Sequence, residues 1–266
     1  MNLHYQVEGD GKTIILIHGL FGSAANLGLL ARSLKNKYKV ISVDLRNHGL
    51  SPHSDHFTYQ EMAQDVLNVI NHLDIDQFSV IGHSMGGKVA MALAAIAPNR
   101  MEHLVVLDMA PVSYQAHRHQ NVFNGLQEVN KHIISKRSEA EHYLAKYVED
   151  AGVRQFLLKS LAKQDDAYQW RFNVDGIIAN YSTIMSWQPA AEPFMGKTLF
   201  IKGQESDYIV PEYRDEIMRQ FPQAKAHMVA NTGHWLHAEK PEAVTRIITN
   251  FLEYSPPKES VKKKKK

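Results

Sequence analysis

A serine between glycines is the residue in this chain most suited to chemistry. It lies in Gly82-His83-Ser84-Met85-Gly86, which fits the pattern Gly-x-Ser-x-Gly. The apolar run 78–81 precedes the segment, and an Ala-, Met- and Leu-rich run follows from Lys88. A sharp strand-to-helix turn pushes such a serine hydroxyl out above the sheet. The pattern alone is also compatible with an incidental serine in a turn, but this context predicts that Ser84 is a nucleophile.

Serine attack on a carbonyl needs two N–H groups to bind the negative oxygen that develops. The residue after the nucleophile usually supplies one of them, which here is Met85. The other is expected from the loop after the apolar run 13–17, which reads His18-Gly19-Leu20-Phe21-Gly22. We predict Leu20 N–H as the second donor, with Phe21 N–H as the alternative.

A serine nucleophile also needs a general base. The chain has 15 histidines, so a histidine by itself is weak evidence. His234 is favoured because it follows the apolar run 226–229, precedes the last helical pattern and satisfies the chain order Ser…Asp…His. His227 and His237 are the alternatives, as strand and helix residues. The histidines predict no metal site, since no His-Glu-x-x-His pattern occurs and the pair around Arg118 lacks further ligands.

Two aspartates are candidates for the acid that orients the base. Asp108 ends the apolar run 104–107, and Asp207 follows the apolar run 198–201. Both are expected at the carboxyl edge of a parallel sheet, where active sites of such folds lie. The residues themselves leave the choice between Asp108 and Asp207 open.

Short apolar runs alternate with helical patterns in the first and last parts of the chain, which indicates an α/β fold with a mostly parallel sheet. Residues 112–187 show four successive helical stripes and no strand run, which favours an inserted helical cap over further sheet-covering helices. We therefore predict a core of residues 1–111 and 188–254 and a cap of residues 112–187. The strand runs are 13–17, 40–43, 78–81, 104–107, 198–201 and 226–229; the helical patterns are 63–73, 88–97, 212–220 and 241–253 in the core, and 122–133, 143–148, 153–161 and 177–185 in the cap.

Composition excludes several other classes of protein. The chain of 266 residues has no cysteine, which rules out disulfides and thiolate chemistry. Neither a secretory signal nor an apolar stretch long enough for stable membrane insertion is visible, so a cytoplasmic protein is expected. The formal net charge of the chain is +2, and residues 258–266 alone contribute +5. Residues 1–257 therefore carry a net charge of −3, which predicts no nucleic-acid partner. Residues 255–266 are predicted to be a disordered basic tail.

Several motifs together resemble the YbfF-type bacterial esterases of the α/β-hydrolase superfamily. They are the segments 18–22, 44–51 (Asp-Leu-Arg-Asn-His-Gly-Leu-Ser), 82–88, 170–173 (Trp-Arg-Phe-Asn) and 233–241 (Gly-His-Trp-Leu-His-Ala-Glu-Lys-Pro). The resemblance extends to about Tyr254 and implies an α/β-hydrolase fold with a helical cap over the serine. It also favours Asp108 as the acid, because the family's aspartate ends the strand before the cap; Asp207 stays the alternative, since other α/β-hydrolases use that later position.

The expected activity is hydrolysis of a small-molecule acyl ester or thioester through an acyl-enzyme on Ser84, without metal or other cofactor. Ser206, Tyr208, Arg118 and Trp235 are the candidates for the substrate pocket. The alternatives are a C–C hydrolase, lactonase or perhydrolase on the same residues, and a ligand receptor without turnover. The sequence does not indicate the oligomeric state.

Overall fold

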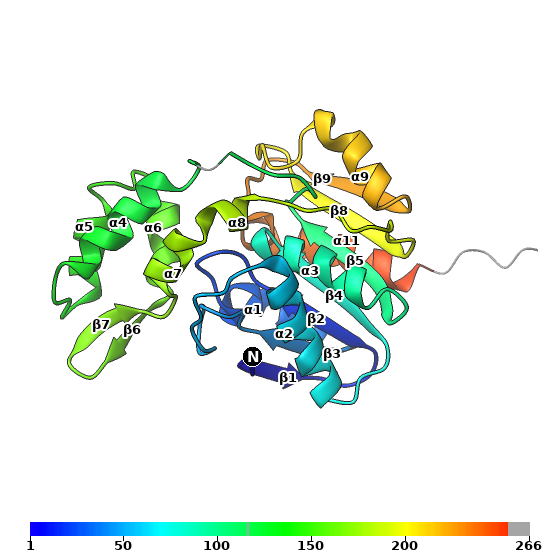
Figure 1. The fold of residues 1–266 in the computed structure, drawn as a ribbon, viewed down its shortest axis with the longest axis horizontal. Helices are drawn as coiled ribbons and strands as arrows, with labels where there is room; N and C mark the ends of the chain where they lie inside the picture. Colours follow the sequence, from blue (N-terminus) through cyan, green and yellow to red (C-terminus); the bar gives the residue numbers. More distant parts are fainter. Residues whose placement is uncertain (116, 255–266) are drawn as a thin grey trace, which may run out of the picture.

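A seven-stranded sheet forms the centre of the computed structural model, which describes residues 1–115 and 117–254 (Figure 1). The strand order is β1-β3-β2-β4-β5-β8-β9, with β1 antiparallel to β3 and the other neighbours parallel. The strands are β1 (Tyr5–Glu8), β2 (Thr13–Ile17), β3 (Lys39–Val43), β4 (Phe78–His83), β5 (Met101–Leu107), β8 (Lys197–Gly203) and β9 (Ala224–Val229). The predicted parallel α/β fold is confirmed.

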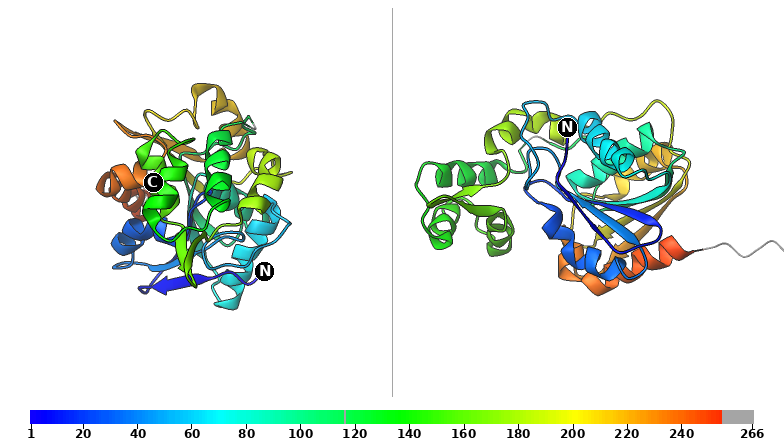
Figure 2. Two further views of the ribbon diagram at one scale, coloured as in Figure 1. Left: turned by 90° about the vertical axis from the view of Figure 1, so that its left-hand side faces the viewer. Right: turned by 90° about the horizontal axis from the view of Figure 1, so that it is seen from below.

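Helices cover both faces of this sheet, which explains why β2 and β4 are buried along their whole length. Helices α2 (Tyr59–His72) and α3 (Met85–Ile96) pack together on one face, and α1 (Gly28–Leu34) and α11 (Pro241–Glu253) pack on the other. The right-hand view of Figure 2 shows these two layers on opposite sides of the strands. The remaining core helices are η1 (Ala24–Leu27), η2 (Pro211–Tyr213), α9 (Arg214–Gln220) and α10 (Leu236–Glu239).

Between β5 and β8 the chain leaves the sheet and forms an additional lobe, here called the insertion (Figures 1 and 2). Its elements all lie within the predicted range 112–187: α4 (Gln120–Asn130), α5 (Arg137–Leu144), α6 (Ala151–Leu158), β6 (Leu161–Gln164), β7 (Ala167–Trp170), α7 (Val174–Ala179) and α8 (Tyr181–Met185).

The prediction that this region has no strand is wrong. β6 and β7 pair antiparallel as a two-stranded hairpin, and Leu161, predicted as the end of a helical stripe, begins β6. The hairpin strands are short, and three of the four β6 residues are not buried. Their sequence therefore lacks the apolar run by which the core strands were recognised. The predicted helix 177–185 is also two helices, which meet at Asn180.

Two core side chains, those of Tyr59 and Lys88, bind carbonyl groups at the end of α8 and so attach the insertion to the core; Tyr114 N–H, from the start of the insertion, binds a third. Tyr59 Oη donates to Ile184 O at 2.5 Å, Tyr114 N–H donates to Met185 O at 2.8 Å, and Lys88 Nζ donates to Ser186 O at 3.0 Å. Lys88 is buried, and burial lowers its pKa to about 7. These bonds supply partners for carbonyls that a helix C-terminus leaves without intrahelical donors.

No helix in the described ranges is long and apolar enough to cross a membrane. The predicted basic tail, residues 255–266, lies outside the described residues.

Candidate active site

Ser84 lies in the turn between β4 and α3 with a backbone that few non-glycine residues adopt, φ 55° and ψ −123°. Two glycines make the turn possible because the chain approaches itself closely there. A β-carbon on Gly82 would lie 2.2 Å from Gly86 O, and one on Gly86 would lie 2.3 Å from Ile17 O. The turn therefore holds Ser84 in a strained conformation at the carboxyl edge of the sheet.

Ser84, His234 and Asp108 form one hydrogen-bonded row. Ser84 Oγ lies 2.8 Å from His234 Nε2, and His234 Nδ1 lies 2.6 Å from Asp108 Oδ2. We assign the imidazole proton to Nδ1, because a carboxylate is an acceptor. Nε2 is then the acceptor for the Ser84 hydroxyl, which is the arrangement that general-base activation of a serine requires.

Asp108 is wholly buried and accepts hydrogen bonds from three directions. Besides His234, Gly203 N–H donates to Oδ1 at 3.1 Å, and the Ser206 hydroxyl donates to Oδ2. A buried carboxylate is tolerated where such donors satisfy it. Asp207, the alternative acid, pairs with Arg118 instead, with an Nη2 to Oδ2 distance of 2.8 Å, and its side chain is 74% exposed.

The loop after β2 lies against the nucleophile turn, since a β-carbon on Gly19 would lie 3.1 Å from Ser84 Cβ. Phe21 N–H, the alternative oxyanion donor, is engaged elsewhere, because it donates to His48 Nε2 at 3.0 Å. Gly22 N–H likewise donates to Gly19 O at 3.1 Å. Met85 N–H is the first amide of α3, where a helix offers no intrahelical acceptor. The N–H groups of Leu20 and Met85 stay the predicted pair of oxyanion donors.

A cavity of about 890 Å³ lies between the core and the insertion and reaches Ser84 and His234. Of the four predicted pocket residues, Arg118, Tyr208 and Trp235 line it. Ser206 is not among the lining residues, and its hydroxyl donates to the buried Asp108 carboxylate. The insertion contributes His119, Val122, Val153, Phe156 and Leu157 to the lining.

Tyr208 packs against the predicted base. Its ring stacks on His234 with centroids 4.1 Å apart and planes inclined by 21°. The Arg118 guanidinium lies 4.2 Å from the centre of the Tyr208 ring. This stack restricts the His234 ring from one side, while Asp108 holds it by Nδ1.

Three further histidines lie around the site: His83 and His119, for which the sequence predicts no role in it, and His237, the alternative base. His83 Nε2 lies 2.8 Å from His234 O and so holds the backbone of the predicted base, although His83 occupies a variable position of the pattern Gly-x-Ser-x-Gly. Burial lowers the pKa of His119 to about 4 and that of His237 to about 3, so both are neutral at pH 7. Within residues 1–115 and 117–254, no group of three or more metal-binding side chains comes together.

Comparison with known proteins agrees with this fold. Residues 14–247 match the model of the alpha/beta hydrolase family, and the chain belongs to that family. It is 44% identical to Esterase YbfF of Escherichia coli over 93% of this chain and 95% of the relative. It is also 38% identical to the mouse (Mus musculus) sn-1-specific diacylglycerol lipase ABHD11, over 92% of this chain and 83% of the relative. Among solved structures, a marine microorganism esterase superposes with a TM-score of 0.90 at 35% identity, covering 94% of this chain and 99% of the other.

Proposed function

We propose that this protein is a serine hydrolase that cleaves carboxylic esters through an acyl-enzyme on Ser84. The observation that carries the proposal is the hydrogen-bonded row of Ser84, His234 and Asp108 beneath a cavity that is open to a substrate. The esterase and lipase names of the relatives support an ester as the bond that is cleaved.

In the proposed reaction His234 Nε2 removes the Ser84 proton while Oγ attacks the ester carbonyl carbon. The carbonyl oxygen becomes negative and is bound by the amides of Leu20 and Met85. Asp108 stabilises the imidazolium of His234, which then protonates the departing alcohol. Water, deprotonated by His234, attacks the acyl-enzyme, and the acid leaves with Ser84 restored.

The cavity supports a substrate larger than a short acetate ester. Its volume of about 890 Å³ falls within the range that binds whole small molecules. Apolar residues of the insertion, among them Val122 and Phe156, line it and would contact an acyl chain. We propose that the insertion acts as the cap of this site, and that an acyl thioester is a second substrate class for the same chemistry.

The test of this proposal is the Ser84→Ala variant, assayed with p-nitrophenyl butyrate. Turnover should fall by about 10³-fold or more, because the nucleophile is removed while binding is kept. Ser33→Ala is the matched control, since Ser33 is an exposed residue of α1 and its loss should leave turnover unchanged. Undiminished turnover in Ser84→Ala would refute the assignment.

Labelling with a fluorophosphonate separates the proposed hydrolase from a receptor that binds without turnover. The probe should react with Ser84 in the folded wild-type protein and not in Ser84→Ala. An unlabelled, folded wild-type protein would favour the receptor. Comparing oxygen esters with coenzyme A thioesters across acyl chain lengths would then test the second substrate class.

A further inference from the structure

Two buried histidines connect the oxyanion loop, residues 18–22, to the loop that follows β3, residues 44–51. His48 Nε2 accepts from Phe21 N–H at 3.0 Å, and His18 Nε2 accepts from Leu45 N–H at 3.0 Å. Each loop thus supplies one histidine that holds a backbone amide of the other loop. The two rings lie with centroids 5.2 Å apart, and both are completely buried.

The second nitrogen of each ring defines its tautomer. His18 Nδ1 lies 2.8 Å from Gly19 O, and His48 Nδ1 lies 3.0 Å from Arg46 O. Since a carbonyl can only accept, both Nδ1 atoms carry the proton and both Nε2 atoms are bare. A second proton on either ring would place N–H against N–H and lose the bond between the loops. Burial lowers the pKa of both rings, that of His48 to about 3, which agrees with two neutral rings.

The bond to His48 holds the oxyanion loop in a conformation that it would not otherwise favour. Phe21 has φ 65°, a region that costs a non-glycine residue about 1 kcal/mol or more. Its N–H is bound by His48, and its carbonyl accepts from the Ser160 hydroxyl at 2.8 Å. Gly19 O, the carbonyl of the peptide group that carries the Leu20 N–H, accepts from Gly22 N–H. The Leu20 N–H is therefore held through its own peptide group, at Gly19 O, and through the following peptide group, at Phe21 N–H.

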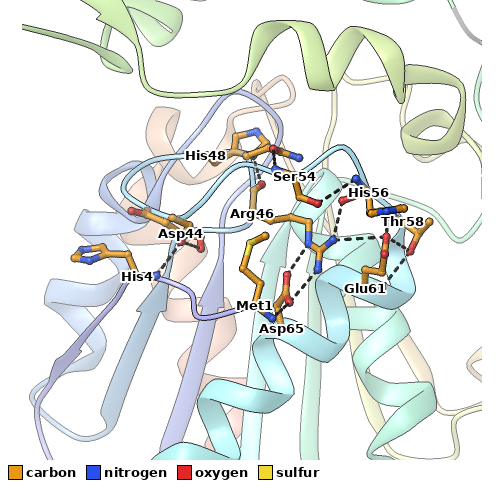
Figure 3. A network of polar contacts seen from close by, with 12 residues as sticks. Met1, His4, Asp44, Arg46, His48, Ser54, His56, Thr58, Glu61 and Asp65 are labelled. Atoms are coloured by element: carbon orange, nitrogen blue, oxygen red, sulfur yellow. Dashed lines mark hydrogen bonds and ion pairs between the residues drawn. The ribbon is translucent and has the colours of Figure 1, made fainter. Parts of the chain in front are cut away.

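The loop that carries His48 is itself rigidly attached to the core. Asp44 accepts from Ala24 N–H at 2.8 Å and from Leu50 N–H at 3.0 Å. Arg46, whose carbonyl binds His48, donates to the buried carboxylate of Asp65 through Nε at 2.7 Å (Figure 3). Such outer contacts keep an inner group in its required geometry.

We propose that His48 and His18 form a neutral pair that positions the Leu20 amide for the oxyanion, with His48 as the decisive positioning residue. This inference rests on the proposed function, because it assumes that an oxyanion develops at Ser84. The pair affects stabilisation of the transition state more than binding of the substrate, because the carbonyl oxygen becomes negative only in the transition state. Displacing the Leu20 N–H would therefore lower kcat and leave KM nearly unchanged.

Two substitutions at His48 test the pair. His48→Phe keeps a ring beside Phe57 and Phe172 but removes the acceptor, and kcat should fall by about 10- to 100-fold with KM within about twofold of wild type. His48→Gln returns an acceptor near the position of Nε2 and should recover most of the loss. His53→Phe is the matched control, because His53 lies close by in the chain, is exposed and binds Arg171 O instead.

A trifluoromethyl ketone inhibitor gives a readout that a general loss of packing would not give. Ser84 Oγ adds to its carbonyl carbon, the serine proton passes to His234, and the former carbonyl oxygen stays as a bound oxyanion. Its inhibition constant should rise in His48→Phe by about the same factor as kcat falls. A folded His48→Phe with unchanged kcat, or a His48→Gln no better than His48→Phe, would overturn the proposal.

Nitrogen NMR of the wild-type histidine rings tests the pair without reference to activity. His48 should show a protonated Nδ1 and a bare Nε2 at pH 7 and at pH 5. A doubly protonated ring at pH 5 would overturn the neutral pair. If the wild-type protein cleaves no ester while His48 shows the expected tautomer, the proposed function fails and the histidine pair stands.

Discussion

Asp108 and Asp207 follow neighbouring strands, β5 and β8, at the same edge of the sheet, yet their surroundings differ completely. Asp108 is buried and accepts from His234, Gly203 N–H and Ser206. Asp207 has a side chain that is 74% exposed, and it pairs with Arg118 of the insertion. The sheet edge thus offers two places for an acid, and burial together with hydrogen-bond donors distinguishes them.

The backbone contributes to the difference. Asp108 has φ 51° and donates its N–H to Ile201 O at 2.7 Å, which turns its side chain under His234. A buried charge with three donors has a single favoured geometry, whereas an exposed ion pair is weak and is screened by salt. The proposed acid is therefore Asp108, the buried aspartate, whereas the exposed Asp207 binds Arg118 of the insertion.

Asp108→Asn should show the largest effect among changes at this edge. An asparagine cannot accept the His234 Nδ1 proton as a carboxylate does, so the ring loses its orientation and the imidazolium loses its counter-charge. We expect kcat for p-nitrophenyl butyrate to fall by about 10³- to 10⁴-fold. Asp207→Asn is the matched control, and equal losses in the two variants would contradict the distinction.

Ser206→Ala should show an intermediate effect. It removes one of the donors to Asp108 Oδ2 and leaves the carboxylate and His234 in place. A single hydrogen bond of this kind is worth about 1 to 2 kcal/mol, so kcat should fall by about 5- to 30-fold. If Ser206 instead contacted substrate, KM would rise while kcat stayed constant, and a steady-state comparison of the two parameters decides this.

Asp207→Asn should change kcat by less than about threefold. Its ion pair with Arg118 is largely exposed, so its loss should lower the free energy of unfolding by less than about 1 kcal/mol. The small effect should shrink further in 1 M NaCl, where exposed charges are screened. Urea unfolding at low and high salt measures it, and a large, salt-independent loss would show that the pair has a structural role.

The pH dependence of the ion pair gives the smallest and most specific signal. The Arg118 guanidinium hydrogen-bonds the Asp207 carboxylate and lowers its pKa below the ordinary 3.8. Because the pKa is lower in the folded protein, the pair stabilises the fold above the unfolded pKa and loses this contribution as the pH falls through the folded pKa. Carboxyl NMR titration should show the lowered pKa in the wild type and a value near 3.8 in Arg118→Gln.

Much of the fold is readable from local patterns. The runs that predicted β2, β3, β4, β5 and β8 are largely buried, as strands covered on both faces are, and the last helical pattern matches α11. The run that predicted β9 also forms a strand, although β9 is mostly exposed. β1 and the hairpin of β6 and β7 escaped prediction because they are short and largely not buried, so pairing rather than apolar sequence defines them. Short stretches of this kind acquire their structure from neighbours distant in the chain.

Some residues of the candidate site can likewise be predicted from local sequence patterns, and others cannot. The positions of Ser84 and His234 follow from local patterns, a glycine-bounded turn and a histidine between the last strand and helix. The roles of Phe21 and Ser206 do not, because they depend on contacts with His48 and Asp108 that lie far away in sequence. A hydrogen bond is directional and short, so residue type alone cannot say which partner a side chain or amide will meet.

The sequence by itself determined that this chain forms a helix-covered parallel sheet with a serine turn at its edge, because apolar periodicity and glycine spacing act over a few residues. Tertiary structure decided which aspartate meets His234, across 126 residues of chain, and which amides of the oxyanion loop stay available. The physical reason is that a carboxylate or an amide takes its role from the donors, acceptors and solvent around it, and folding alone brings these together.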